Sequence, residues 1–402
     1  MAPASSRFCS FLGGHLAALF ARPWPVFPSA MVIGALNVFL FAFDKPWTAS
    51  DGLRNWGDVL LGGLGLLDQD ALLPPHFYSG SVLNIGLLFG GLIGALLSHE
   101  FAVRAAPGKE IAKGAVGGVL MGVGAILAFG CNIGGFFSAL SALSLSGFGM
   151  MAGLLVGGFG ASRVIIRERA RQIEEGQVGF VSPCEAPPRA RADGIQHSQP
   201  RAGLVVCLSV VLIAGGYLYF GHGRLAVFLS FGVLFGIILQ RSRFCLVNAF
   251  REPFLSGRSE HARAAASALL FSMLGMAILK AGDLKDAGEW VFPSFWFGSL
   301  LGGTIFGFGM VLAEGCGAGT LWRAGEGHVK LWAALVCFAL SASLTRFFLV
   351  STDRIRQLGG AYFLPDLLGW PAALISVAAL MLTWYVLAAW NEERRQIGVL
   401  KL

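Results

Sequence analysis

The sequence has few charged residues. Only 13% of its 402 residues are Asp, Glu, Lys or Arg, against roughly 25% in soluble domains. Hydrophobic residues make up 55% of the chain, and the mean hydropathy is +0.68. A soluble chain of this length normally divides into two or three domains with polar surfaces. The low charge excludes that class and predicts a polytopic membrane protein whose surface faces lipid.

The sequence also lacks the spacings that hold metals, nucleotides and nucleic acids. None of its seven cysteines lies in a CxxC pair, and no His lies at zinc-finger distance, so we expect neither a metal nor another cofactor. An odd number of cysteines in mainly apolar surroundings also argues against a disulfide framework. No GxxxxGK loop is present, so we expect no nucleotide-driven transport. The net charge of +7 is not accompanied by a basic-aromatic cluster, so nucleic acid is not an expected partner.

Glycine is abundant instead, with 56 residues, and many of them lie in an internal repeat. Residues 117–134 read GGVLMGVGAILAFGCNIG and residues 302–319 read GGTIFGFGMVLAEGCGAG, and nine positions are identical without gaps. The alignment pairs Cys131 with Cys316. Glycine lets helix backbones approach closely or break. A repeat of this kind in apolar sequence predicts two pseudo-repeated halves that face one site.

Apolar runs recur along the chain at the length needed to cross a bilayer, which is about 20 residues. We expect an all-α membrane protein with about 9–10 transmembrane helices and broken or re-entrant Gly-Cys elements. Arginines concentrate in residues 162–202, which we expect to form a disordered linker. Under the positive-inside rule this linker and both termini are cytoplasmic. The predicted organisation is an N-terminal interfacial helix, first span and outer loop (1–79), a first half-repeat (80–161), the linker (162–202), a second half-repeat (203–350), and a last span with the C-terminus (351–402).

The two Gly-Cys elements are the main candidates for chemistry. Irregular backbone at membrane depth is tolerated where it is buried in protein or lines a wet cavity. Its free amide groups favour an anion, and a polarizable thiol suits a sulfur-bearing anion better than a strongly hydrated oxyanion. The alternative is that the glycines only let helices cross while the cysteines fill space. The candidate residues here are Gly130, Cys131, Asn132, Gly134, Glu314, Gly315, Cys316 and Gly319.

Two basic segments lie near further candidates. Arg241 and Arg243 precede Cys245 and could attract an anion toward it, although ordinary positive-inside anchoring is the simpler explanation of the arginines. Arg323 follows the second Gly-Cys element and is spaced to pair with Glu326 at i,i+3. Glu314 stands in apolar sequence, where it could tune the nearby thiol or gate access, or could simply pair locally.

A weaker match extends the repeat. Leu88-Phe89-Gly90 aligns with Leu234-Phe235-Gly236, and the same offset places His99 opposite Cys245. If the first half contributes a relay group at this position, that group is an imidazole where the second half has a thiol.

Three segments of the chain resemble the YeeE/YedE sulfur-transport family, whose longer members are associated with sulfur or selenium metabolism. The segments are AFGCNIGGFFSALSALSLSGF (128–148), QRSRFCLVNAFREPFLSGR (240–258) and GFGMVLAEGCGAGTLWRAGEGHV (307–329). The resemblance implies a bacterial inner-membrane transporter that passes thiosulfate between the thiols of Cys131, Cys245 and Cys316. It also implies a separate TusA-like cytoplasmic sulfur carrier as a partner, besides the lipid bilayer. The position paired with Cys245 departs from this pattern, because it holds His99 and not a cysteine.

Three functions are therefore compared. The first is a permease, not an enzyme, for a small sulfur-containing anion such as thiosulfate or a related selenium compound. The second is a membrane thiol enzyme that transfers sulfane sulfur, for which the sequence offers neither a CxxC pair nor a clear base beside a cysteine. The third is a membrane assembly factor that transports nothing.

Overall fold

The computed structural model describes residues 20–67, 72–174 and 199–394, and in these ranges the chain is built of helices. Ten of its segments are long and apolar enough to cross a membrane, which confirms the predicted fold class. Their long helices are α2 (Val26–Phe43), α4 (Ser79–Leu97), α5 (Gly108–Leu127), α7 (Ser146–Glu174), α8 (Gln199–Tyr219), α9 (Gly223–Ser242), α11 (Glu260–Ala281), α12 (Phe297–Ala313), α14 (Val329–Ser351) and α16 (Trp370–Arg394). The predicted interfacial helix falls in residues 1–19, outside the described residues.

Short helices interrupt this set of spans. Four interior positions are taken by α3 (Ser50–Gly63), the π-helix η1 (Asn132–Ser138) continued by α6 (Ala139–Ser141), α10 (Leu246–Leu255) and α13 (Gly317–Gly325). Of these, η1 and α13 are the broken elements that the Gly-Cys sequences predict, whereas α3 and α10 were not predicted. Two further short helices, η2 (Ile355–Leu358) and α15 (Leu364–Leu368), lie between α14 and α16.

The helices form two repeats of the same plan. Each repeat runs long, short, long, long, short, long: α2 to α7 in the first and α9 to α14 in the second, with α8 and α16 following them. The packing pairs match, since α4 packs on α9 and α11 on α2, while α5 packs on α14 and α12 on α7. The first span and the outer loop therefore belong to the first repeat. The first repeat therefore starts at α2, earlier than the predicted range of 80–161. The second starts at α9, later than the start of the predicted range of 203–350.

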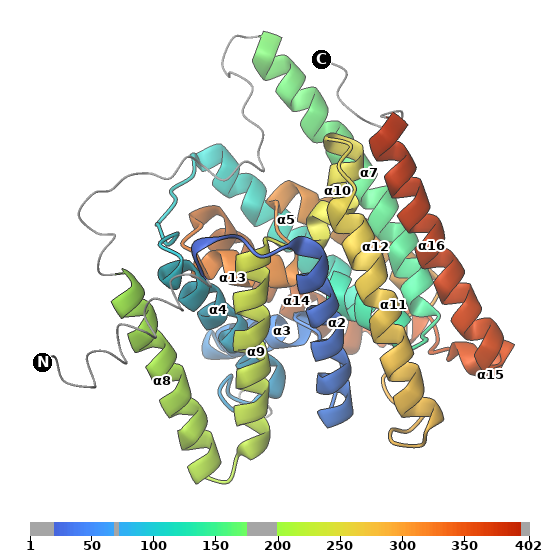
Figure 1. Cartoon of the computed structure of the whole chain (residues 1–402), viewed down its shortest axis with the longest axis horizontal. Coiled ribbons are helices and arrows are strands. Elements are labelled where there is room, and N and C mark those ends of the chain that lie inside the picture. Colours follow the sequence, from blue (N-terminus) through green and yellow to red (C-terminus); the bar gives the residue numbers. More distant parts are fainter. Residues whose placement is uncertain (1–19, 68–71, 175–198, 395–402) are drawn as a thin grey trace, which may run out of the picture.

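The two repeats have opposite directions across the molecule (Figure 1). We call the side on which α7 ends and α8 begins the linker face, and the other side the opposite face. Trp24, just before α2, donates its amide proton to the carbonyl of Arg241 at the end of α9. Conversely Arg224, at the start of α9, bonds to Asp44 just after α2. Because α2 leaves the linker face and α9 returns to it, the repeats are inverted, as in many transporters.

The seam between α4 and α9 explains part of the glycine content. A Cβ atom on Gly90 would lie 2.2 Å from the carbonyl oxygen of Val233, and one on Gly236 would lie 2.2 Å from that of Leu87. Only glycine lets these two backbones approach so closely.

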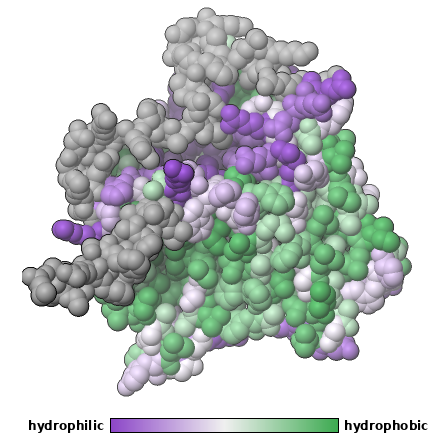
Figure 2. Space-filling view, viewed as in Figure 1, coloured by the Kyte–Doolittle hydropathy of each residue, from purple (hydrophilic) through white to green (hydrophobic). Residues whose placement is uncertain are grey.

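The surface agrees with a membrane protein. In the view of Figure 2, hydrophobic residues form a broad band over the helices, and hydrophilic residues gather toward the linker face. The prediction for the linker is wrong in part. Residues 162–202 are not disordered throughout, because α7 continues to Glu174 and α8 begins at Gln199. Arginine is a good helix former, and the ion pair between Lys113 and Glu168 (2.6 Å) ties this extension of α7 to α5.

Candidate functional site

Three cysteines occupy equivalent positions at the centre of the molecule. Cys131, Cys245 and Cys316 each stand immediately before a short interior helix, at the starts of η1, α10 and α13 respectively. All three have extended backbones and are almost completely buried. The first turns of α10 and α13 present free amide groups and the positive end of the helix dipole, both of which favour an anion.

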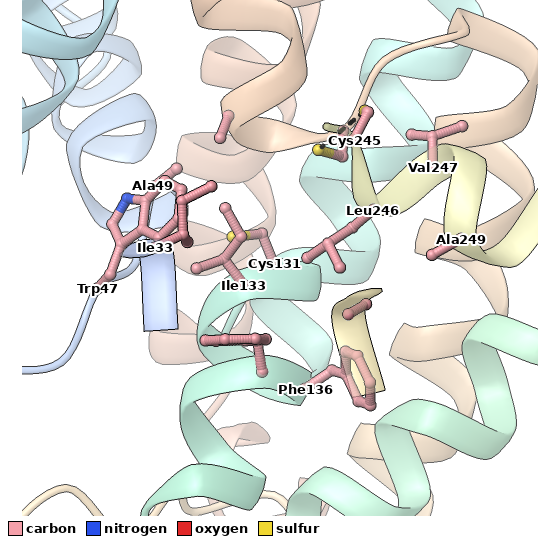
Figure 3. Close-up of a cluster of buried hydrophobic side chains, with 14 of the residues drawn as sticks. Ile33, Trp47, Ala49, Cys131, Ile133, Phe136, Cys245, Leu246, Val247 and Ala249 are labelled. Carbon is pink, nitrogen blue, oxygen red and sulfur yellow. Dashed lines mark hydrogen bonds between the residues drawn. The ribbon is translucent and has the colours of Figure 1, made fainter. Parts of the chain in front are cut away.

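The thiols of Cys245 and Cys316 lie side by side, and Figure 3 shows Cys245 and Cys131 in one cluster of buried side chains. The sulfur atoms of Cys245 and Cys316 are 3.9 Å apart, and the amide of Gly319 donates to the Cys316 sulfur at 3.3 Å. Cys131 contacts the residue next to this pair, because a Cβ atom on Gly317 would lie 3.5 Å from the Cys131 sulfur. The structure thus brings the three predicted thiols to one place.

A narrow cavity adjoins the thiol pair. Its volume is about 20 Å³, room for about one water molecule. We call this small cavity, with the thiols of Cys245 and Cys316 in its lining, the constriction. The lining residues are mostly apolar: Ile33, Trp47, Ile133, Phe137, Leu239, Phe244, Cys245, Leu246, Cys316, Ala318, Gly319 and Trp322.

Buried polar groups around the constriction have no hydrogen-bond partner within residues 20–67, 72–174 and 199–394. Asn132 is fully buried, and neither its amide nitrogen nor its oxygen is bonded. Its side chain lies near the Cys316 thiol, outside hydrogen-bond geometry. The indole nitrogens of Trp47 and Trp322, which both line the cavity, are also unbonded. Because buried polar groups are nearly always satisfied, three unbonded donors here are consistent with a site for an acceptor-rich anion.

An ion network covers the linker-face side of the constriction. Arg243, two residues before Cys245, bonds to Glu326 at 2.7 Å and to Glu100 at 2.7 Å. Its guanidinium lies 5.5 Å from the ring centre of Trp322, which lines the cavity. The Arg243 side chain is 38% exposed, so the network reaches from the constriction to water.

Glu326 is the buried anion of this network. Burial alone would raise its pKa, but the hydrogen bond with His328, the charge of Arg243 and the hydrogen bond from Gln240 outweigh that effect and lower the pKa to about 2. Burial lowers the pKa of His328. Glu326 is therefore charged at neutral pH and holds Arg243 in place.

We expect acid to remove the contribution of Glu326 to stability. Its pKa falls from 4.5 to about 2 on folding, so the contribution is complete above pH 4.5 and disappears as the pH falls toward 2, with a size of about 3 kcal/mol. Thermal unfolding of the wild type and Glu326→Gln in detergent, between about pH 3 and 6, measures it. The gap in melting temperature between the two proteins should narrow as the pH falls, and a gap independent of pH would contradict this role.

The predicted pairing of His99 with Cys245 is wrong for this fold. The order of helices pairs α9 and α10 with α2 and α3, so the counterpart of Cys245 is Ala49, which directly precedes α3. Ala49 borders the site, since a Cβ on Gly317 would lie 3.6 Å from its Cβ. His99 instead follows α4 with φ 60°. The misleading Leu-Phe-Gly match arises because both glycines serve the close seam between α4 and α9.

The other predicted residues lie beside the constriction or on its linker-face side. Arg323 does not pair with Glu326 as its spacing suggests: it donates to the carbonyl of Glu314 at 2.8 Å, and Glu326 pairs with Arg243. The Glu314 carboxylate approaches Lys330 at 3.7 Å. The glycines of the two motifs, Gly130, Gly134, Gly315 and Gly319, flank the starts of η1 and α13. A Cβ on Gly319 would lie 3.2 Å from both the Cys245 and the Cys316 sulfur.

Sequence reasoning missed Trp47 and Glu100. Trp47 stacks on Phe235 with ring centres 4.0 Å apart and lines the cavity, but its sequence neighbours give no sign of this contact. Glu100 could have been found, because it is a lone acid at the end of an apolar run, where a charge needs a partner.

Comparison with known proteins decides the family. The chain matches the family described as Sulphur transport over residues 6–160 and 241–400, more than half of its length. The chain belongs to this sulfur-transport family. It is 27% identical to "Probable transporter YedE" of Escherichia coli (strain K12) over 324 residues, which is 77% of each chain. It is also 39% identical to "Thiosulfate transporter TsuA" of the same organism over 117 residues, 29% of this chain and 32% of that one. A second "Thiosulfate transporter TsuA", from Spirochaeta thermophila, is 36% identical over 115 residues, 29% of this chain and 34% of that one.

Membership agrees with the resemblance found in the sequence. The first matched segment covers most of the first repeat, and the second covers the second repeat from the end of α9 onward together with α16. The relatives are named as transporters. The chain is a multi-pass membrane transporter and not an enzyme.

Proposed function

We propose that the protein is a permease for a small sulfur-containing anion such as thiosulfate or a related selenium compound. The observation that carries the proposal is the meeting of three buried thiols, each at the start of a short interior helix, between inverted repeats. The partial similarity to proteins named as thiosulfate transporters supports the choice of substrate.

The chemistry of the constriction favours a soft anion. Its lining is apolar except for the thiols of Cys245 and Cys316 and two indole nitrogens. Sulfate would lose its water shell there in exchange for few strong donors, which is costly. Thiosulfate carries part of its charge on a polarizable sulfur atom, which weak S–H donors can accompany at a lower desolvation cost.

The proposed path runs from the opposite face past Cys131 to the Cys316 and Cys245 pair and leaves beside Arg243. An anion arriving there competes with Glu326 and Glu100 for the guanidinium, so Arg243 would act as an exit gate. We further propose that the linker face is the cytoplasmic side of a bacterial inner membrane, as its arginines favour. A separate TusA-like carrier would receive sulfur on that face.

Uptake by the purified protein in liposomes tests the proposal. We expect saturable uptake of radiolabelled thiosulfate well above that of empty liposomes, and little uptake of radiolabelled sulfate. Thiosulfate uptake no faster than in empty liposomes would overturn the proposal. Equal uptake of both anions would contradict selection by the thiols.

Gly319→Ala tests whether the anion passes the thiol pair. The new methyl group would lie 3.2 Å from both sulfur atoms, and we expect the rate of thiosulfate uptake to fall about tenfold. The backbone of Gly319 does not need glycine, since its φ is not positive. Gly216→Ala in α8 is the matched control because a Cβ there meets no atom within 4 Å. Equal rates for the two variants would place the path elsewhere.

A further inference from the structure

A buried lysine lies at the opposite face, on the other side of the constriction from Arg243. Lys45 follows α2 and is only 8% exposed. Its ammonium faces three aromatic rings at 5.4 Å (Tyr78), 5.7 Å (Phe228) and 6.0 Å (Trp290). The rings come from three separate parts of the chain: the residue before α4, helix α9 and the segment before α12. All three rings therefore lie close to one cation.

Among the described residues no carboxylate lies within ion-pair distance of this ammonium, although the charges of Asp51 and Asp44 act on it. Within the described ranges, the Lys45 ammonium makes neither a hydrogen bond nor an ion pair. Asp44 is occupied by two bonds from Arg224, at 3.0 and 2.5 Å. Burial lowers the pKa of Lys45, opposed by the charges of Asp51 and Asp44. A buried ammonium that is not paired is costly, and a bound anion would offset that cost.

The segment that carries Lys45 leads directly to the thiols. Two residues on, Trp47 lines the cavity beside Cys245 and Cys316. The hydroxyl of Ser50, at the start of α3, accepts a hydrogen bond from the amide of Cys131 at 3.2 Å. The unpaired cation and the constriction are therefore joined by one short piece of chain.

We propose that Lys45, with the rings of Tyr78, Phe228 and Trp290, binds the small sulfur oxyanion at the opposite face before it enters the constriction. The ammonium binds the charged oxygen atoms, and the three rings keep water away from the ion pair. The low dielectric of a largely buried site strengthens the charge interaction. This inference rests on the proposed function for its substrate class, but the binding site does not require that transport be observed.

The test compares Lys45→Gln and Lys45→Arg with Lys109→Gln, a substitution of an exposed lysine at the start of α5. In liposomes we expect Lys45→Gln to raise the KM for thiosulfate about tenfold while the maximal rate stays within about twofold of wild type. Lys45→Arg should keep most of the affinity, and Lys109→Gln should match wild type. An unchanged KM in Lys45→Gln, with normal wild-type uptake, would overturn the capture site and leave the proposed function standing.

Melting temperature in detergent gives a second readout that does not depend on transport. Without thiosulfate, Lys45→Gln should be at least as stable as wild type, because it removes an unpaired buried charge. With thiosulfate, wild type should gain stability and Lys45→Gln should not. A loss of stability in Lys45→Gln without thiosulfate, with an unchanged thiosulfate shift, would assign Lys45 to packing and overturn the site. Thiosulfate could also raise the melting temperature of wild type but not of Lys45→Gln, while wild type takes up no thiosulfate. That result would support the binding site and reject the permease.

Discussion

Cys316→Ala is expected to lower the initial rate of thiosulfate uptake at least about tenfold, and Cys131→Ala to lower it similarly. Cys316 is central to the constriction: its sulfur lies 3.9 Å from that of Cys245 and accepts a hydrogen bond from the amide of Gly319. Alanine removes the thiol and leaves a mostly apolar passage, so an anion there would lose water without gaining a donor. The measurement is uptake of radiolabelled thiosulfate into liposomes at matched protein content.

Cys207→Ala is the control for these substitutions. Cys207 is an exposed residue of α8, so its replacement should leave the rate unchanged. Wild-type rates in both Cys131→Ala and Cys316→Ala would rule out passage of the anion from thiol to thiol.

Oxidation of the thiol pair is expected to stop transport completely and reversibly. The sulfur atoms of Cys245 and Cys316 are 3.9 Å apart, so a mild oxidant such as copper phenanthroline can take one hydrogen from each thiol and join the two sulfurs. The disulfide has no S–H donor, so the pair can no longer accompany an anion whatever the width of the passage. Peptide mass spectrometry should find the Cys245–Cys316 crosslink and its loss on reduction.

The single variants Cys245→Ala and Cys316→Ala cannot form this crosslink and are the matched controls. The same oxidant should leave whatever uptake they retain unchanged. Crosslinks that instead join Cys131 to either partner would show that the thiols are arranged differently.

Much of the fold could be predicted from the sequence because lipid imposes simple rules. Apolar length gives the spans, and the paired Gly-Cys motifs give the broken elements and the two halves. The inversion of the halves was not predictable from Cys131 and Cys316 alone, because a repeated motif does not give its direction across the membrane. That direction follows from contacts such as the one between Arg224 and Asp44, which join residues far apart in sequence.

The candidate site could be predicted in part. Cys131, Cys245 and Cys316 carry a local signal, a thiol beside glycine or arginine at the end of an apolar run. Ala49 and Lys45 carry none, because their importance arises from what the other repeat and the neighbouring aromatic rings place beside them. The error over His99 has the same origin: glycines that serve helix packing resemble glycines that mark a repeat.

The most direct test of the central claim is the uptake of thiosulfate by one liposome preparation before oxidation, after oxidation and after reduction. If the anion passes between Cys245 and Cys316, uptake should fall to the level of empty liposomes when the crosslink forms and recover when the crosslink is reduced. Unchanged uptake in vesicles whose protein is fully crosslinked would contradict the account.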